Sequence, residues 1–216
     1  MKKLFIMTFL LFASTVSFFA IDMSSKQIFE HPLNEESSEF KKIESSLSDS
    51  AMKADFVQTK LIAKFNKSLK SSGTMMLQPG KGMMWITEKP YESKMVVAKD
   101  CMKQQVAGGK VVSQKVEGNA IYIAIAEAME NVFSGHFSQI KEVFDAYFII
   151  DKDEWYIGLI PLSKEFSSVV SFITLSGKDY IEKVYMEEVG GNSILYEFDK
   201  VELRELYEEE KDLFNF

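Results

Sequence analysis

The sequence has few of the residues from which cross-links, metal centres and nucleophilic sites are built. It contains one cysteine, Cys101, and two histidines, His31 and His136, in 216 residues. A single cysteine excludes an internal disulfide, and its position far from the N-terminus excludes a lipid-modified first cysteine. So small a set disfavours Cys/His catalysis and a zinc cluster. We expect Cys101 to be a small buried or strand residue.

Motifs of the common enzyme classes are also missing. The sequence has no P-loop, GxSxG, HExxH or dinucleotide-binding fingerprint. His136 follows Ser134 and Gly135 at a predicted helix break, where a surface or helix-capping histidine is the simpler explanation. The carboxylates of residues 151–154 fall in a predicted turn between strands, where solvated loop charge is ordinary. We predict a protein that is not an enzyme and that uses no cofactor or metal.

Positive charge is in deficit. Aspartate and glutamate number 32 against 25 lysines and arginines, which gives a formal net charge of −7. This balance argues against nucleic acid as a partner and against binding to anionic lipid surfaces. It suits a partner with a basic docking face, and solubility alone explains it equally well.

The apolar N-terminus is too short to span a bilayer. Lys2 and Lys3 precede the apolar run Leu4–Phe12, which small and polar residues follow. The stretch up to Phe19 is interrupted by serine and threonine and falls short of the roughly 20 apolar residues of a transmembrane helix. We predict that about residues 1–20 form a signal peptide, which is cleaved at some point beyond residue 17, and that residues 21–216 form one exported domain.

The chain continues with the pattern of an amphipathic helix. Phe40, Ile43, Leu47 and Ala51 recur at spacings of three and four, and Asn34 can cap the helix. We predict this helix over about residues 35–53.

From Ala54 onward the apolar period changes to two, which predicts a mainly β (α+β) domain with one antiparallel sheet of about eleven strands. The expected strands lie near residues 54–64, 73–78, 83–88, 93–99, 102–106, 111–117, 146–151, 154–161, 169–176, 181–188 and 193–203. Two helices, broken at Gly135, are predicted between the sixth and seventh strands. A curved sheet of this size has a larger interior than its own side chains fill, so helices, a ligand or both must occupy it.

Methionine is concentrated around one tryptophan. Six of the twelve methionines lie within residues 75–102, on either side of Trp85. Flexible methionine side chains suit a surface that adapts to variable apolar cargo, and they equally suit an irregular core. Trp85 likewise has two explanations, as a cavity residue or as a structural anchor.

Six short motifs occur in an order that is typical of one family. They are Phe56-Val57-Gln58, Ser71-Ser72-Gly73, Pro79-Gly80-Lys81, Trp85 with Pro90, Leu159-Ile160-Pro161, and Glu188 followed by Gly191-Asn192. In this order, behind a predicted signal peptide, they make the chain resemble the LolA-like periplasmic carriers of outer-membrane lipoproteins. The resemblance extends from about residue 40 to the C-terminus.

The resemblance implies both a fold and a function. The implied fold is a single unclosed antiparallel β-barrel with a helical lid, and the implied function is to bind lipoprotein acyl chains in a hydrophobic cavity in the periplasm. The implied partners are an inner-membrane ATP-driven transporter that releases the lipoprotein and an outer-membrane acceptor, and we expect a monomer. The cavity candidates are Phe56, Met76, Trp85, Met95, Trp155, Ile157, Phe172, Met186, Tyr196 and Phe198 on strands, with Ile121, Ile125 and Phe144 on the covering helices.

Two departures from the family pattern bear on these expectations. Family members usually have an arginine before the proline of the second turn, where it is thought to help hold the lid, whereas here Gln78 precedes Pro79. Glu188 stands where an aspartate is usual. Alternative functions are a related binder that carries a different lipid or glycolipid for an exporter, and a lipoprotein-sensing regulator on the same scaffold. A secreted lipid-modifying hydrolase is disfavoured by the missing motifs.

Overall fold

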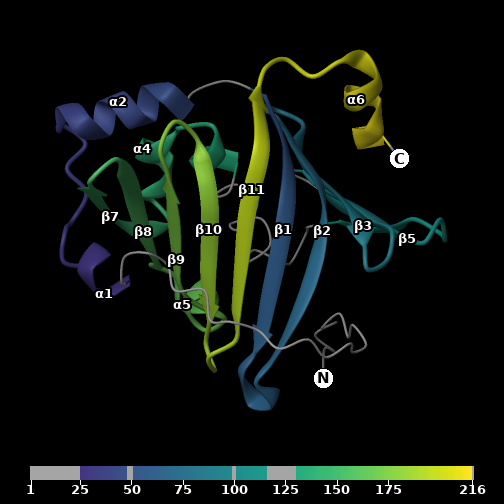
Figure 1. Cartoon of the computed structure of the whole chain (residues 1–216), viewed down its shortest axis with the longest axis horizontal. Coiled ribbons are helices and arrows are strands. Elements are labelled where there is room, and N and C mark those ends of the chain that lie inside the picture. The colour runs from purple at the N-terminus through teal and green to yellow at the C-terminus, as the bar shows by residue number, and fades with distance from the viewer. Residues whose placement is uncertain (1–24, 48–50, 99–100, 116–129, 216) are drawn as a thin grey trace.

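A computed structural model of the chain consists of one antiparallel sheet and several short helices (Figure 1). It describes residues 25–47, 51–98, 101–115 and 130–215. The predicted signal peptide, and Ile121 and Ile125 of the predicted lid, lie outside the described residues. Among the residues described, no helix is long and apolar enough to cross a bilayer. The mainly β architecture predicted from the sequence is confirmed.

Each of the eleven predicted segments is a strand of the sheet. The strands are β1 (Met52–Ile62), β2 (Lys67–Gln78), β3 (Gly82–Lys89), β4 (Ser93–Val97), β5 (Cys101–Val106), β6 (Val112–Lys115), β7 (Phe144–Asp151), β8 (Glu154–Pro161), β9 (Val170–Gly177), β10 (Ile181–Glu188) and β11 (Ser193–Leu203). The ends agree with the prediction within a few residues, except that β2 begins well before residue 73. The β1–β2 hairpin is therefore longer than expected.

The helices are short. They are α1 (Ser25–Ile28), α2 (Ser38–Leu47), α4 (Phe137–Ile140), α5 (Lys164–Ser167) and α6 (Glu208–Asp212), with 3-10 turns η1 (Ala63–Phe65) and η2 (Leu213–Asn215). Residues 130–133 are also helical. The predicted break at Gly135 is confirmed, because its φ of 70° ends that helical segment.

One long-range ladder holds the sheet together. The strand order is β6-β5-β4-β3-β2-β1-β11-β10-β9-β8-β7, so every neighbouring pair except β1 with β11 is consecutive in the chain. The β1–β11 ladder runs from Met52 opposite Leu203 to Leu61 opposite Ser193. It joins an N-terminal group of strands to a C-terminal group. Because β6 and β7 remain as edges, the barrel is not closed.

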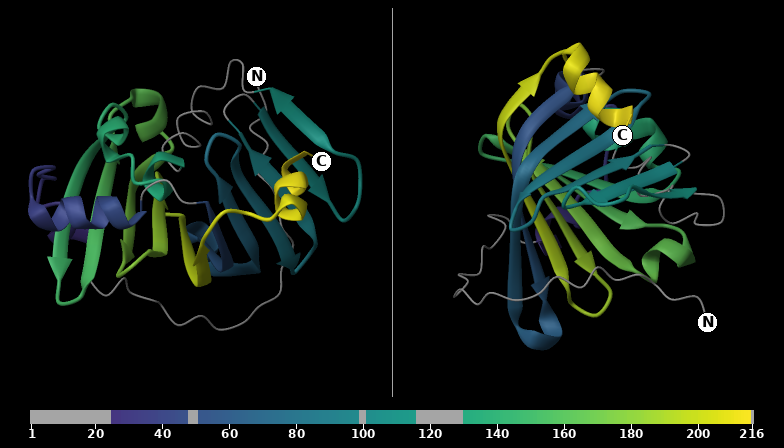
Figure 2. Two further views of the ribbon diagram at one scale, coloured as in Figure 1. Left: turned by 90° about the horizontal axis from the view of Figure 1, so that it is seen from above. Right: turned by 90° about the vertical axis from the view of Figure 1, so that its right-hand side faces the viewer.

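The sheet is strongly curved, so that β7–β9 and β3–β5 lie on opposite sides of its interior (Figure 2). One cause lies at Gly73, where the register between β2 and β3 shifts. A Cβ atom on Gly73 would lie 1.9 Å from the carbonyl oxygen of Ile86. Only glycine permits so close an approach of the two backbones. The glycine of the Ser71-Ser72-Gly73 motif is therefore required by the packing of one strand on the next.

Alternation along the strands gives the sheet an inner and an outer face. The inner face carries the main hydrophobic cluster, to which α2, residues 130–133, α4 and α5 contribute buried side chains. The outer face is covered in two places, by α1 against β7 and β8 and by the C-terminal segment against β2, β3 and β4. Helical segments therefore cover the inner face, while most of the first helix predicted between the sixth and seventh strands lies outside the described residues.

Helix α2 is shorter than the predicted helix. Ser37 caps it, because its hydroxyl accepts a hydrogen bond from the Phe40 N–H at 3.1 Å, whereas Asn34 belongs to the preceding turn. The helix ends at Leu47, and β1 begins at Met52. Residues 52 and 53, assigned to the helix from the sequence, thus belong to the sheet, whose alternation starts before Ala54.

One buried carboxylate fixes the C-terminal segment to the outer face. Glu210 is 6% exposed and accepts hydrogen bonds from Arg204 Nη1 at 2.8 Å and Nη2 at 3.0 Å. It also accepts from Lys53 Nζ and from the Tyr207 N–H, both at 2.8 Å. Since Lys53 is on β1 and Arg204 directly follows β11, Glu210 ties α6 to both strands. Hydrogen bonding to Arg204 holds the pKa of Glu210 well below its ordinary value.

We expect Glu210→Gln to lower the melting temperature by about 5 °C at neutral pH, because two cations lose their buried counter-charge. Glu209→Gln, an exposed neighbour in α6, is the control. Because the pKa of Glu210 is lowered in the folded state, its ionised carboxylate contributes fully to the free energy of unfolding above the ordinary carboxyl pKa of 4.5. This contribution is lost as the pH falls through the folded-state pKa. The gap between the melting temperatures of wild type and Glu210→Gln should therefore begin to narrow as the pH falls below 4.5 and should go on narrowing with further acidification. A constant gap between them would contradict this role.

Candidate functional site

Most of the predicted cavity residues meet on the inner face. Those buried within the main cluster are Phe56, Phe144, Trp155, Ile157 and Phe198, and those partly buried against it are Trp85, Met186 and Tyr196. Met95 lies opposite Trp85 in the β3–β4 ladder and therefore shares its face. These residues come from strands at both ends of the sheet. Its curvature brings their side chains to one interior.

An aromatic group around the β1–β11 ladder forms the centre of this interior. Phe56 and Phe198 are direct partners in the ladder, and the Tyr196 ring stacks on Phe198 with centroids 6.1 Å apart. Phe133, from the covering helical residues, meets the Phe198 ring edge-on at 5.6 Å. The covering layer thus reaches the middle of the inner face.

Met76 and Phe172 lie on the outer face, so their assignment to the cavity is wrong. Met75 is the inner residue of its pair, and Met76 packs with Met84 beneath the C-terminal segment. The Phe172 ring contacts that of Phe29, just after α1, at 5.3 Å. Both errors are shifts of one residue in strand phase. Consecutive apolar residues conceal the phase that alternation would otherwise reveal.

Phe144 also differs from its prediction, since it is the first residue of β7 and not part of a helix. It nevertheless lies in the interior, with its ring 5.2 Å from that of Phe166 in α5. Sequence reasoning missed Met75, Leu77 and Met83, which are buried in the same cluster. Met83 lies two residues before Trp85 and so shares its face, a signal that was available in the sequence.

A polar group interrupts the apolar inner face beside the aromatic group, on the side of the β1–β2 hairpin tip. Gln58 Nε2 donates a hydrogen bond to the Tyr196 hydroxyl at 2.6 Å, and Gln58 Oε1 accepts one from the Ser71 hydroxyl at 2.8 Å. Burial raises the pKa of Tyr196 to about 12. Its hydroxyl therefore stays protonated at neutral pH. We call these three side chains the polar rung.

The covering residues 130–134 meet the β2–β3 turn through a carboxylate. The Gly80 N–H donates to Glu130 Oε1 at 3.1 Å. Gly80 has a φ of 75°, which the Pro79-Gly80-Lys81 turn requires. The contact uses a backbone donor and an acidic side chain, and Gln78 stands where the family has its arginine. We call this junction between the β2–β3 turn and residues 130–134 the seam.

Buried polar atoms without partners occur on both sides of the seam. Gln78 Oε1, Trp85 Nε1 and the Ser134 hydroxyl are buried and have no hydrogen-bond partner among the described residues. Gln78 adjoins the turn, Trp85 is on the strand that leaves it, and Ser134 ends the covering segment. Each such group costs about 1–3 kcal/mol. The seam is therefore a weakly held part of the covering layer.

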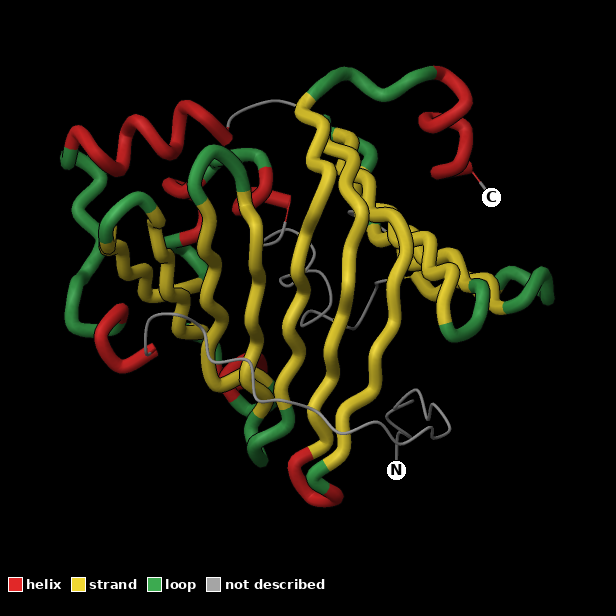
Figure 3. The backbone as a smooth tube through the Cα atoms, in the orientation of Figure 1, coloured by secondary structure: helices red, strands yellow, loops and turns green. Residues whose placement is uncertain are grey.

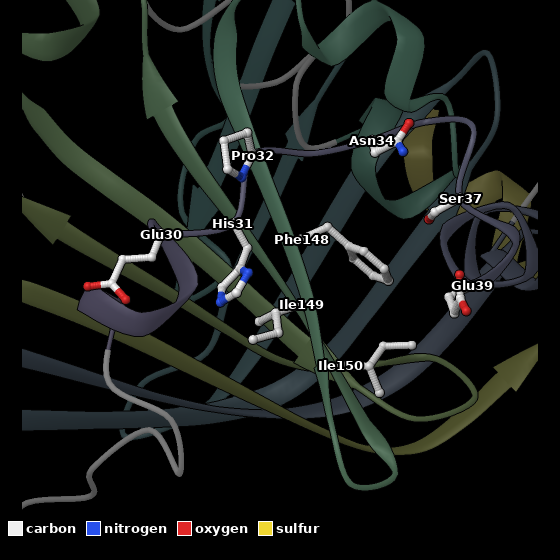
Figure 4. Close-up of a pocket in the computed structure, with 9 residues that line it drawn as sticks. All are labelled: Glu30, His31, Pro32, Asn34, Ser37, Glu39, Phe148, Ile149 and Ile150. Atoms are coloured by element: carbon white, nitrogen blue, oxygen red, sulfur yellow. The ribbon is translucent and has the colours of Figure 1, made fainter.

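Two open hollows are lined by residues that the structure describes. One of about 380 Å³ lies between edge strand β7 and the segment that links α1 to α2 (Figure 4). It is lined by Glu30, His31, Pro32, Asn34, Ser37, Glu39, Phe148, Ile149 and Ile150. The other, of about 500 Å³, lies against the outer face of β1, β2 and β11, where Asp55, Val57 and Glu197 alternate with the inner residues. It is lined by Asp55, Phe56, Val57, Ser72, Gly73, Glu88, Glu197, Phe198 and Asp199. Carboxylates line both hollows, which does not suit acyl chains.

The described residues offer apolar surface and little chemistry. They contain no group of three His, Cys, Asp or Glu side chains that could hold a metal ion. Ser134 is only 2% exposed, whereas His136 is exposed, so a substrate would not reach this serine from the solvent. Cys101 begins β5, as a strand residue.

Residues 48–216 match the family described as outer membrane lipoprotein carrier protein LolA. The chain belongs to this family. The family is one of carrier proteins, and its match covers all eleven strands and the C-terminal segment. No curated protein gives a significant match to the chain.

Solved structures that are similar in fold include the following three. A LolA superfamily protein from Nitrosomonas europaea is 6% identical, with a TM-score of 0.45 and coverage of 79% of this chain and 94% of that one. A putative outer membrane lipoprotein-sorting protein domain from Vibrio parahaemolyticus is 10% identical, with a TM-score of 0.42 and coverage of 81% and 94%. A DUF1329 family protein from Desulfovibrio piger is 7% identical, with a TM-score of 0.42 and coverage of 76% and 90%.

The two tryptophans should respond differently to loss of the indole N–H. Trp155 Nε1 donates to the Lys178 carbonyl oxygen at 2.8 Å, whereas Trp85 Nε1 is buried without a partner in the described structure. We expect Trp155→Phe to lower the free energy of unfolding by about 1 kcal/mol more than Trp85→Phe does. Urea unfolding of both variants measures the difference. Equal losses of unfolding free energy in the two variants would show that Trp85 Nε1 is hydrogen-bonded in solution.

Proposed function

We propose that this protein is a periplasmic carrier that binds the acyl chains of lipoproteins on its inner face and shuttles them from the inner to the outer membrane. The continuous apolar inner face of the curved sheet, covered by helices, is the observation that carries the proposal. Each buried methylene contributes about 0.8 kcal/mol, so exposing one long acyl chain to water costs on the order of 10 kcal/mol. A lipoprotein that crosses an aqueous compartment therefore needs such a shield.

Acyl binding requires part of the covering layer to move. Phe133 and Phe137 lie over the sheet and contact Phe198 and Phe40, so an acyl chain must displace them. We infer that opening begins at the seam, where the Gly80–Glu130 hydrogen bond is accompanied by buried polar atoms that lack a partner in the described part of the chain. Segments that must open for function are drawn from the weakly held parts of a structure.

The polar rung fixes the expected orientation of the ligand. Acyl chains belong on the side of Phe56 and Phe198, where the inner face is apolar. The ester and glyceryl groups of a lipoprotein, which need hydrogen bonds when buried, belong beside Gln58, Ser71 and Tyr196. A carrier of this kind needs no catalytic group, and the buried Ser134 hydroxyl does not favour a hydrolase.

Mass spectrometry of apolar material that co-purifies from the periplasm tests the proposal. We expect triacylated lipoprotein with the wild type and none with Phe198→Glu, because a carboxylate at the centre of the inner face repels acyl chains. Met186→Glu, at a partly buried inner position, is a second variant in case Phe198→Glu fails to fold. Leu195→Glu, on the outer face of β11, is the matched control, and circular dichroism checks folding.

Free glycolipid or phospholipid in place of lipoprotein would assign the chain to the related lipid binders. Bound lipoprotein retained by the folded Phe198→Glu and Met186→Glu variants would remove the inner face as the acyl site.

Opening at the seam can be measured by hydrogen exchange. We expect Glu130→Ala to speed exchange of the amides of residues 132–136 by about five- to tenfold, since one exposed hydrogen bond contributes about 1–1.5 kcal/mol. Glu142→Ala, an exposed carboxylate beyond α4, should leave these rates unchanged. The same rates in both variants would show that the seam does not control opening.

A further inference from the structure

The β1–β2 hairpin concentrates positive charge in an otherwise acidic chain. Between Asp55 and Glu88 the sequence has no acidic residue, while the whole chain has a net charge of −7. The lysines in this interval are Lys60, Lys64, Lys67, Lys70 and Lys81. All but Lys81 lie within residues 60–70, which form the end of the hairpin. This end is therefore positively charged, opposite in sign to the protein as a whole.

The end of the hairpin also projects from the sheet. β1 pairs with β11 only as far as Leu61, and β2 pairs with β3 only from Ser72. Residues 67–71 consequently pair with β1 alone. Figure 3 shows the 3-10 turn η1 at the tip extending beyond the other turns at this end, and the right-hand view of Figure 2 agrees.

Exposed apolar side chains accompany these lysines along one rim. Phe65, at the tip, is 62% exposed. The Ala63 N–H donates to Asn192 Oδ1 at 3.1 Å, which holds the tip against the β10–β11 turn, where Val189 is 54% exposed. The Val189 N–H in turn bonds to the carbonyl oxygen of Val169, also exposed. Phe65, Val189 and Val169 thus follow one another along the rim.

The lysines at the tip face solvent. Lys64 and Lys67 are exposed, and the Lys64 ammonium lies 5.8 Å from the centroid of the Phe65 ring. Glu188, an acidic neighbour at this rim, forms an ion pair with Lys60, with 3.3 Å between Lys60 Nζ and Glu188 Oε1. Glu188 Oε2 also accepts a hydrogen bond from Asn192 Nδ2 at 3.1 Å. An aromatic ring between exposed lysines is the composition of an interfacial membrane anchor.

We propose that this rim, made of residues 60–70 with Val169 and Val189, docks on the surface of a membrane that contains anionic lipids. The net charge alone predicts no affinity for such a surface. At physiological ionic strength, however, charges are screened beyond about 8 Å, so the lysines nearest the membrane decide the interaction. The rim does not use the apolar inner face, and the proposal therefore stands apart from acyl binding.

Sedimentation with lipid vesicles tests the docking surface in the chain without its predicted signal peptide. We expect binding to phosphatidylcholine vesicles that contain phosphatidylglycerol, little binding to phosphatidylcholine alone, and weakening by salt. The double variant Lys64→Glu/Lys67→Glu should reduce the partition coefficient by about tenfold or more, and Phe65→Ser by about fivefold. Tyr91→Ser in the β3–β4 turn and Lys110→Glu in the β5–β6 turn are matched exposed controls that should bind as the wild type.

No binding to either kind of vesicle, equal binding to both, or equal losses in the controls would overturn the proposal. Binding to native membranes that disappears after protease treatment of those membranes would assign the rim to an acidic protein partner and would also overturn it. The Phe198→Glu variant, which should lose acyl binding, should still bind vesicles. The experiment can therefore contradict membrane docking without contradicting acyl binding, and the reverse.

Discussion

The pairing of β1 with β11 is the constraint on which the rest of the structure depends. Every other ladder joins strands that are consecutive in the chain, whereas this one joins residues such as Gln58 and Tyr196, 138 positions apart. Bringing β1 and β11 together closes a long loop and costs conformational entropy. The contacts of this ladder must outweigh that cost before the two groups of strands form one sheet. Phe56 and Phe198 face each other within it, so the apolar centre of the interior forms only when the two groups of strands have joined. The covering helices then have a curved face to pack on.

The two covering layers are held in different ways, and the difference fits a carrier. On the outer face, Glu210 is buried and accepts four hydrogen bonds, which tie the C-terminal segment to β1 and to the end of β11. On the inner face, the Gly80–Glu130 bond lies near buried polar atoms that have no hydrogen-bond partner among the residues described. The outer layer is held by a hydrogen-bond network in which the buried carboxylate of Glu210 has its partners. A fully hydrogen-bonded network of this kind makes the surrounding structure rigid. This difference supports the proposal that the inner layer is the one that opens.

Local sequence patterns predicted where the strands lie. The face to which some of their side chains point depends on long-range packing, which these patterns do not show. Each hairpin carries its own turn residues and alternation, which is why all eleven strands were found. The phase of Met75 and Met76 was hidden because both are apolar and both are buried, one inside and one beneath the C-terminal segment. Phe172 was assigned to the wrong face for a similar reason. On the outer face it packs against Phe29, which follows α1, and the local sequence around Phe172 does not predict this long-range contact. The early start of β2 was missed because residues 67–72 are mostly polar and pair with β1 alone until β3 begins.

The order of features along β1 connects the interior with the outside of the molecule. Phe56 lies at the apolar centre, Gln58 lies in the polar rung two residues later, and the basic hairpin tip with Phe65 follows. A lipid held with its acyl chains on the aromatic side and its polar groups at the rung has its head group directed towards that tip. If the tip lies on an anionic membrane surface, the polar end of the ligand faces the same surface. A single hairpin, made longer than its neighbours by residues 62–71, would then set both the orientation of the cargo and the orientation of the carrier on the membrane.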